Sequence, residues 1–227
     1  MFRFLLFFLF LLTYGCSSFN TEPKYTIRVF EKDNPKFLLM PVDIEICELT
    51  IAGMCEPSAS WTKDSKQNII TSFKDILSSR NAILNEYDTS SETDELIQLI
   101  KLHSQMGQEI INNEYGLYQL PTKTDFKWNL GKKVKLLKKQ YKSDYAIFIF
   151  FRDQYSSTER VIYNIVTAVL FPGIIPVGGS QLAFASLVDL RDGKIIWFNG
   201  YYRSFGDVRN LEDAKNTIDK LFEKFPG

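Results

Sequence analysis

The second half of the chain carries the clearest pattern of apolar and polar positions. Residues 144–153 (DYAIFIFFRD) contain an unbroken apolar run, which predicts a strand covered on both faces of its sheet. Residues 181–204 contain two apolar stretches around Asp192-Gly193, a dipeptide typical of the turn of a β-hairpin. Apolar residues then recur at helical spacing up to Phe225, after Asn210, which can cap a helix. This half therefore predicts a buried strand, a hairpin and a last helix.

In the first half, strand-like and helix-like segments alternate. Residues 36–49 predict a strand in which Pro41 lies where no backbone N–H is needed for pairing, because proline has none. The other predicted elements are a helix over 62–80, a short strand over 82–87, a helix from Ser90 or Ser91 to about Asn113, and a helix near 127–142. This order of elements predicts a single α/β domain over residues 36–227, with a mixed sheet, a C-terminal β-hairpin followed by a helix, and helices packed on the sheet.

A long stretch without charge interrupts this pattern. No charged residue occurs from Val161 to Val188, although 24% of the chain is charged. Pro and Gly residues break its middle, and the intact apolar piece up to Phe171 has eleven residues, fewer than the roughly 20 that a membrane-spanning helix needs. Packing within the domain is the favoured interpretation, and an oligomer interface or contact with lipid are the alternatives. Val169 and Ile174 are the candidate interaction residues of this stretch.

The N-terminus has the layout of a secretory leader. A positive end precedes nine consecutive apolar residues, Phe4 to Leu12, and Gly15-Cys16 follows shortly afterwards. This ending resembles the lipobox of bacterial lipoproteins, in which the cysteine thiol is acylated, for example with palmitate, and becomes the mature N-terminus. A plain signal or an uncleaved anchor is the alternative.

The lipobox resemblance implies a division of the N-terminal region. Residues 1–15 would form a signal peptide, Cys16 would carry the lipid, and residues 16–35 would form a lipidated N-terminus and tether. Ser17, in place of an aspartate after the cysteine, implies sorting to the outer membrane, with the protein on its periplasmic side.

Charge and cysteine content narrow the environment further. From Cys16 onward the chain has 26 Lys and Arg, since one of the 27 is Arg3, against 27 Asp and Glu. A net charge near −1 gives no electrostatic case for a nucleic-acid partner. Cys47 and Cys55 lie eight positions apart around an expected strand end and turn. In an oxidising compartment they can form a disulfide or remain two half-buried thiols, and geometry decides between the two.

The sequence contains little that indicates catalysis. His103, the single histidine, lies on the apolar stripe of a predicted helix, which favours a hydrogen-bonded core residue. The chain has no histidine cluster, CxxC pair, Walker loop or dinucleotide-binding glycine pattern, so we predict no catalytic residue, no metal site and no cofactor.

Polar residues gather after the buried strand and on the hairpin. They are Arg152, Asp153, Tyr155, Ser156 and Ser157, followed by Asp189 and Asn199. One interpretation is a rim at strand ends that recognises a partner or ligand. The favoured interpretation is that these side chains satisfy turn and backbone groups, with Trp197 in the core.

Three segments resemble a known group of proteins. They are LLMPVDIEICELTIAGMCEPSASWT (38–62), DYAIFIFFRD (144–153) and SLVDLRDGKIIWFN (186–199). The chain resembles a family of Gram-negative outer-membrane lipoproteins of uncharacterised activity over most of residues 36–225. More distantly, the order of its elements is similar to the anticodon-binding-domain-like fold of envelope lipoproteins, which include the curli-secretion channel subunit, the Pel polysaccharide export lipoprotein and a penicillin-binding-protein activator. This resemblance implies a non-enzymatic assembly or export factor, and several members of the group form rings.

The sequence thus predicts a non-enzymatic outer-membrane lipoprotein that faces the periplasm and acts in assembly, export or envelope maintenance. Its expected partners are the membrane, through the lipid on Cys16, and further copies of the chain or other envelope proteins. The alternative is a periplasmic hydrolase or a small-ligand-binding lipoprotein that uses the Arg152–Ser157 region.

Overall fold

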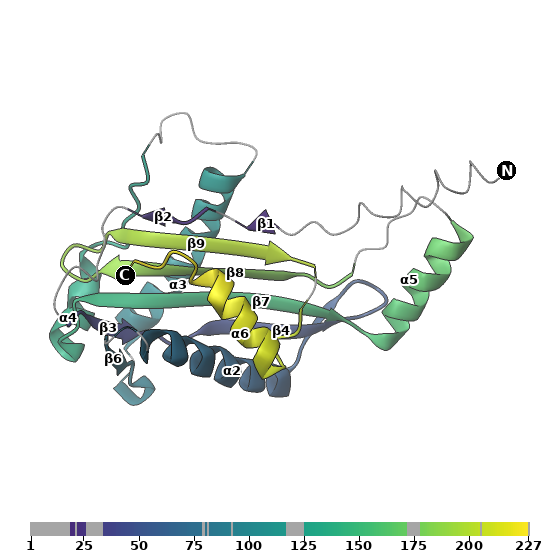
Figure 1. Cartoon of the computed structure of the whole chain (residues 1–227), viewed down its shortest axis with the longest axis horizontal. Coiled ribbons are helices and arrows are strands. Elements are labelled where there is room, and N and C mark those ends of the chain that lie inside the picture. The colour runs from purple at the N-terminus through teal and green to yellow at the C-terminus, as the bar shows by residue number, and fades with distance from the viewer. Residues whose placement is uncertain are drawn as a thin grey trace.

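The apolar run at 144–153 forms the central strand of the sheet, β7 (Tyr145–Ser156) (Figure 1). It is seen in a computed structural model that describes residues 19–20, 22–25, 34–78, 80, 82–91, 93–116, 125–171, 178–204 and 206–226. On one side of β7 lie, in antiparallel order, β8 (Gln181–Asp189) and β9 (Ile195–Arg203). On its other side, β3 (Lys36–Leu39) and β4 (Asp43–Leu49) pair with it in parallel.

Short strands complete the edges of the sheet. β6 (Ile83–Glu86) pairs in parallel with β3, and β5 (Cys55–Pro57) pairs antiparallel with β4. β1 (Phe19–Asn20) and β2 (Lys24–Tyr25) both pair antiparallel with β9. The result is a mixed sheet in the order β1-β9-β8-β7-β3-β6, so the predicted α/β class, with a hairpin before the last helix, is confirmed.

Pro41 divides the predicted strand 36–49 into two. β3 pairs with the first part of β7, and β4 pairs with the second part from Phe150 onward. Pro41 lies between the two, outside either strand, so its missing N–H removes no bond from the ladder. The expectation for this proline is confirmed, and a single edge of β7 is covered by both strands.

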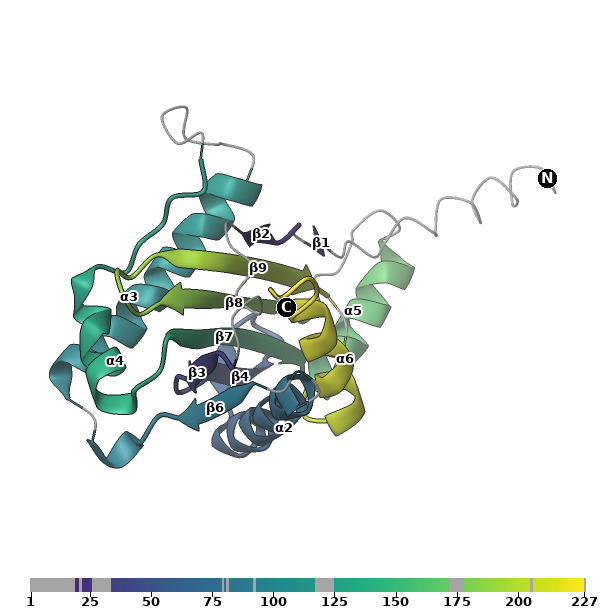
Figure 2. The ribbon, with the colours of Figure 1, turned by 60° about the vertical axis from the view of Figure 1, so that its left-hand side comes forward.

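Helices cover both faces of the sheet (Figure 2). α2 (Ala59–Ser78) and α6 (Leu211–Leu221) pack on one face, and α3 (Asp94–Ile110) and α4 (Lys135–Tyr141) pack on the other. The side chains of β7 alternate between the two layers, because successive residues of a strand point to opposite faces. Ile147 and Phe151 belong to the first layer, whereas Phe148 and Phe150 belong to the second. The apolar sequence of β7 is therefore continuous because its side chains contribute to two cores, one on each face of the sheet.

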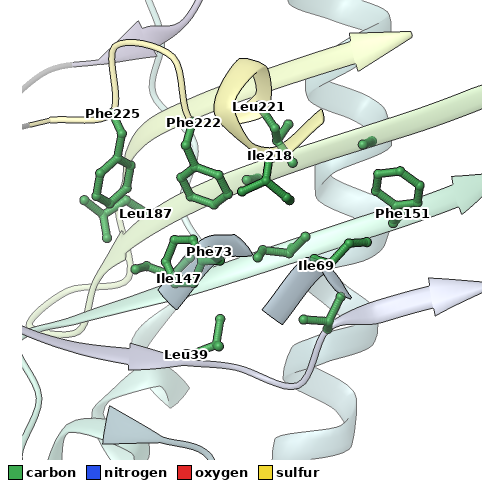
Figure 3. Packing of buried hydrophobic residues seen from close by; sticks show 14 of the residues in the cluster. Leu39, Ile69, Phe73, Ile147, Phe151, Leu187, Ile218, Leu221, Phe222 and Phe225 are labelled. Atoms are coloured by element: carbon green, nitrogen blue, oxygen red, sulfur yellow. The ribbon is translucent and has the colours of Figure 1, made fainter. Parts of the chain in front are cut away.

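The first core shows how the last helix is held. Ile218 and Leu221 of α6, with Phe222 and Phe225 just beyond it, face Phe73 of α2 and the strands (Figure 3). The rings of Phe73 and Phe222 lie 4.7 Å apart. Asn210 caps α6, since its side chain accepts a hydrogen bond from the backbone N–H of Glu212 at 2.8 Å. The predictions for this helix and its cap are confirmed.

The predicted hairpin and most of the predicted helices are confirmed, with shifted boundaries. The β8–β9 turn includes Gly193, whose φ of 85° suits glycine. The predicted cap at Ser90 or Ser91 is wrong, because α3 begins only at Asp94, and Ser90 instead donates its hydroxyl hydrogen to Asp88. α3 continues into a wider turn, η3 (Ile111–Tyr115). The helix predicted near 127–142 is shorter, because the chain forms a bridge between Asn129 and Lys194 before η4 (Lys132–Val134) and α4 begin.

A disulfide joins the paired strands β4 and β5. The Cα atoms of Cys47 and Cys55 lie 5.5 Å apart, within the range that a disulfide spans, and their sulfurs are bonded. Cys47 is buried, and Cys55 lies on an exposed strand. The bond closes the turn that leads into α2.

Replacing both Cys47 and Cys55 by serine should lower the free energy of unfolding by about 2–3 kcal/mol in the chain-entropy account, because the closed loop is short. Denaturant unfolding of the two proteins measures this difference. Alkylation of the unfolded, unreduced protein from an oxidising compartment should label neither cysteine. Labelling of both would contradict the bond.

Candidate functional site

The polar residues at the end of β7 do not form one rim, because neighbouring side chains point to opposite faces of the sheet. Arg152 lies on the face that α3 covers, where its guanidinium donates to Oδ1 of Asp43 at 2.7 Å and lies 4.1 Å from the centre of the Phe150 ring. Ser104 of α3 donates to Oδ2 of the same carboxylate at 2.5 Å. Arg152 therefore holds β4 against β7, and Asp43 links both to α3.

Asp153 lies on the opposite face, within a buried polar network. Its carboxylate accepts hydrogen bonds from the hydroxyl of Tyr155 at 2.6 Å and from the side-chain amide of Gln181. The hydroxyl of Tyr155 also accepts a bond from the backbone N–H of Val208 at 3.0 Å. These bonds join β7 to the start of β8 and to the segment before α6.

The network continues through Gln181 into β9 and α6. The side-chain oxygen of Gln181 accepts bonds from the hydroxyl of Tyr201 at 2.6 Å and from Nε of Arg203 at 2.9 Å. Arg203 also donates to the hydroxyl of Thr217 in α6 at 2.5 Å. Because buried polar groups are costly unless they are paired, this network fixes one end of the sheet and the helix beside it.

A cavity of about 290 Å³ opens beside the network. Asp153, Tyr155 and Gln181 form part of its wall together with Arg209. The guanidinium of Arg209 lies 3.9 Å from the centre of the Tyr155 ring and 4.4 Å from that of Trp61, and Asp207 pairs with it at 2.8 Å. The cavity wall is therefore largely polar.

The chemistry available in this cavity is limited. Burial raises the pKa of Asp153 to about 6, although the bonds from Tyr155 and Gln181 oppose the rise. A carboxyl group with such a pKa can act as a general acid or base, but it needs a partner that it can activate. The lining residues include serines and no histidine, cysteine or lysine, and the Asp153 carboxylate already accepts two protein hydrogen bonds. The geometry gives Asp153 a role in holding strands together.

Three of the remaining polar candidates, Ser157, Asp189 and Asn199, also bond to the protein itself. Ser157 caps α5 (Thr158–Leu170), since its hydroxyl oxygen accepts from the backbone N–H of Arg160 at 3.2 Å. Asp189 accepts from the backbone N–H of Arg191 at 2.8 Å in the hairpin turn. Asn199 donates to the backbone oxygen of Leu221 at 2.9 Å and so holds α6 to β9. Ser156 lines the cavity, and Trp197 is fully buried in the first core.

His103 is a buried histidine, as its position on an apolar stripe predicts. Its Nε2 lies 2.6 Å from the hydroxyl of Ser186, and its ring stacks on Phe148 with the centres 4.4 Å apart. Burial lowers its pKa to about 3, although the nearby charge of Asp43 opposes this. A Ser–His pair can act in nucleophilic catalysis, but His103 and Ser186 are 2% and 0% exposed, and a substrate cannot reach them. The prediction of a hydrogen-bonded core histidine is confirmed.

For the uncharged stretch, the favoured interpretation of packing within the domain is confirmed for the second part and wrong for the first. Its second part, β8, is buried, but its first part forms α5, which has no buried residue. α5 projects beyond the end of the sheet, away from the other helices (Figure 1). The exposed fractions reach 60% for Ile165, 72% for Val169 and 64% for Leu170. Packing within the domain therefore does not explain this apolar surface.

α5 turns its polar side toward the protein and its apolar side outward, the reverse of an ordinary surface helix. Its least exposed residues are Arg160, Asn164 and Thr167, which recur at the spacing of one helix face, and all three are polar. The exposed large apolar residues are Val161, Ile162, Tyr163, Ile165, Val166, Val169, Leu170 and, just after the helix, Phe171. An ordinary surface helix turns its apolar stripe toward the core. α5 presents an apolar face to the surroundings, and this face is the candidate functional site.

The helical spacing of polar residues in the sequence could have indicated that this segment forms a helix with one polar and one apolar face. The polar positions 160, 164 and 167 mark one stripe, and Ser157 is a good cap. The sequence does not say, however, that the polar stripe would be the side turned toward the rest of the protein. Two predicted residues, Cys16 and Ile174, lie outside the described residues.

In the described part of the chain, no three or more histidine, cysteine, aspartate or glutamate side chains are grouped so that they could hold a metal ion. Among the described helices, none combines the length and apolar character that crossing a bilayer requires.

Comparisons with known proteins give a weak likeness. No family model and no curated sequence matches the chain. The PelC dodecamer from Paraburkholderia phytofirmans is similar at 9% identity over 94% of this chain and 99% of that chain, with a TM-score of 0.43. Lipoprotein GNA1162 from Neisseria meningitidis follows at 12% identity over 85% and 99%, with a TM-score of 0.34, and the LpoB C-terminal domain from Salmonella enterica at 13% over 73% and 80%, with 0.25. These TM-scores are too low for the likeness to bear on function.

The buried histidine should make the protein less stable as the pH falls. Its folded pKa is about 3, whereas an unfolded histidine titrates near 6.5, so the stability that neutral His103 contributes is present above 6.5 and is lost below it. The difference in unfolding free energy between the wild type and His103→Gln should shrink by about 2 kcal/mol between pH values of about 7.5 and 5. Ser186→Ala, which keeps the histidine, should retain the wild-type pH dependence. A pH-independent difference would contradict the buried neutral state.

Asp153 should have the opposite effect. Its folded pKa of about 6 is above the ordinary aspartate pKa of 3.8, so the folded state binds the proton more tightly and stability falls as the pH rises through 6. Relative to Asp153→Asn, the wild type should lose about 2 kcal/mol of unfolding free energy between pH values of about 4 and 7. Urea unfolding at several pH values measures this loss. A relative gain over that range would show that the carboxylate is stabilised in its charged form.

Proposed function

We propose that this chain is a non-enzymatic lipoprotein of the outer membrane, acylated at Cys16 and facing the periplasm, that acts in assembly, export or envelope maintenance. Its partners in this role are the membrane, through the lipid, and other envelope proteins or further copies of the chain. The leader and its Gly15-Cys16 ending support the anchor.

The observation that carries the proposal is the uncovered apolar face of α5. An apolar patch of this kind on a protein surface marks a place where something binds. Three described residues with perturbed or paired reactive groups are instead enclosed: His103 and Ser186 lie in the core, and Asp153 is bonded to Tyr155 and Gln181. The chain thus offers its surroundings a surface for contact and keeps its reactive groups inside.

The same contacts weigh against the hydrolase alternative. A hydrolase that used a serine of the Arg152–Ser157 region as its nucleophile would need a base beside that serine. Arg152 and Asp153 lie on opposite faces of the sheet, and Ser157 serves as the cap of α5. The cavity beside Asp153 leaves room for a small polar ligand, but Asp153, Tyr155 and Gln181 in its wall are bonded to one another.

Replacing Cys16 by serine should abolish acylation, because serine has no thiol to modify. The mature wild-type protein should have the mass of the chain from residue 16 plus its acyl groups. The variant should instead appear as a soluble form or as an unprocessed chain that retains the leader. Mass spectrometry of membrane and soluble fractions distinguishes these species.

The control for this experiment is the Cys47→Ser, Cys55→Ser protein, which should keep the acylated mass and the membrane location. An unchanged mass and an unchanged membrane fraction for Cys16→Ser would refute the lipoprotein assignment.

A further inference from the structure

One end of the sheet gathers the features that the preceding sections leave unexplained. β7 ends at Ser156 and leads directly into α5, and β4 ends beside it, because Leu49 pairs with Ser156. β8 begins at this end, where Gln181 pairs with Arg203 at the end of β9. In Figures 1 and 2, α5 extends outward from here. The apolar face of α5 therefore belongs to a definite pole of the molecule, which we call the α5 pole.

The turn between β4 and β5 adds apolar surface to the α5 pole. Ile51 and Met54 in this turn are 53% and 61% exposed. Arg160 of α5 holds the turn, since its guanidinium donates to the backbone oxygen of Thr50 at 3.0 Å. The helix and the turn are thus joined through the polar stripe of α5, and their apolar side chains remain outside.

The N-terminal segment is tied to the same pole. β1 pairs with the last residues of β9, with Phe19 opposite Tyr202. Cys16 precedes Phe19 by three residues, and a fully extended chain of that length spans at most about 11 Å. A lipid on Cys16 would therefore keep the α5 pole against the bilayer surface, and a rotation of the domain that placed the opposite pole there would break the β1–β9 pairing.

We propose that α5 lays its apolar face into the lipid leaflet that holds the acyl chains of Cys16, with Ile51 and Met54 as neighbouring contacts. This inference rests on the acylation proposed above, because the acyl anchor selects lipid as the occupant of the face. It assigns α5 a second, non-covalent attachment that orients the domain on the membrane.

The dimensions and chemistry of α5 fit an interfacial helix. Thirteen residues make a helix about 20 Å long, too short to span a bilayer but long enough to lie along its surface. Such helices bury their apolar face roughly 5–10 Å into the boundary between headgroups and acyl chains. Tyr163 and Phe171 lie toward opposite ends of the apolar segment, and aromatic side chains favour this boundary.

The same composition favours lipid over a second protein. Protein interfaces include hydrogen-bonding groups throughout, about one bond per 100–200 Å². Among the exposed side chains of α5 from Val161 to Leu170, the only polar atom is the hydroxyl oxygen of Tyr163. A face that is apolar and lacks polar groups matches the interior of a leaflet better than the surface of a folded partner.

The charge on α5 indicates how it would bind. Arg160 is the only cation in its sequence and Glu159 the only anion, so electrostatic attraction to anionic lipid contributes little. Binding should therefore depend on apolar burial and should change little with salt or with the share of anionic lipid.

The test uses the mature chain from residue 16 with Cys16→Ser, so that no acyl chain obscures the contribution of α5. The protein is floated with vesicles of phosphatidylcholine, with and without phosphatidylglycerol, at low and high salt. We expect it to float with both kinds of vesicle. Val169→Asp should weaken binding roughly tenfold or more, because a charge would have to enter the interface. Leu136→Asp, a matched change of an exposed apolar residue on α4, should bind like the parent.

Circular dichroism and native mass accompany the flotation. Val169→Asp should keep the spectrum of the folded domain, because Val169 is 72% exposed. Three results would overturn the proposal: no binding of the parent chain to vesicles, equal binding of the parent and Val169→Asp, or unfolding of that variant. A parent chain that forms oligomers, does not float and becomes monomeric with Val169→Asp would identify a second copy as the occupant instead.

The outcome is independent of the test of acylation. Failure of vesicle binding with a lipid-modified mass on Cys16 would leave the proposed lipoprotein intact and remove only the role of α5. Vesicle binding without acylation in cells would refute the lipoprotein assignment and leave α5 as a lipid-binding helix with no acyl anchor beside it.

Discussion

The double burial of β7 is the constraint on which the rest of the structure depends. Its apolar side chains alternate between two cores, so helices must cover both faces of the sheet along most of the strand. At Arg152 the apolar sequence ends, and the strand continues with side chains that bond on both faces to neighbouring elements. The change from apolar to polar residues along β7 divides the domain into two parts. One part is held together by apolar packing, and the other, the α5 pole, is held together by hydrogen bonds.

The α5 pole combines a rigid polar interior with an apolar exterior. Asp153, Gln181 and Arg203 hold β7, β8, β9 and α6 together there. Ser157 and Arg160 then fix the start of α5 and its contact with the β4–β5 turn. The network explains why a helix with no buried residue can keep a defined direction, since its base is bonded to the sheet. The proposed attachment to lipid uses this direction to orient the domain.

Much of the fold could be predicted from the sequence, because strong local patterns determine it. The buried strand, the Asp192-Gly193 turn and the Asn210 cap each depend on residues that lie close together in the chain. The polar candidates could not be assigned to partners, because Asp153 meets Gln181 and Asn199 meets Leu221 only after the sheet has formed. The exposure of α5 cannot be predicted from the sequence for a related reason. Apolar sequence shows that a surface must be covered, and the tertiary fold decides whether the protein itself covers it.

The orientation of α5 in a bilayer is the most direct test of this account. Val169→Cys can be labelled with an environment-sensitive fluorophore in acylated protein whose Cys47 and Cys55 are bonded, and the protein can be reconstituted in vesicles that carry nitroxides on the upper acyl chain. The account predicts a blue-shifted emission that the nitroxides quench strongly, and a Leu136→Cys label that stays in water and is quenched little. Equal, weak quenching at both positions would contradict it.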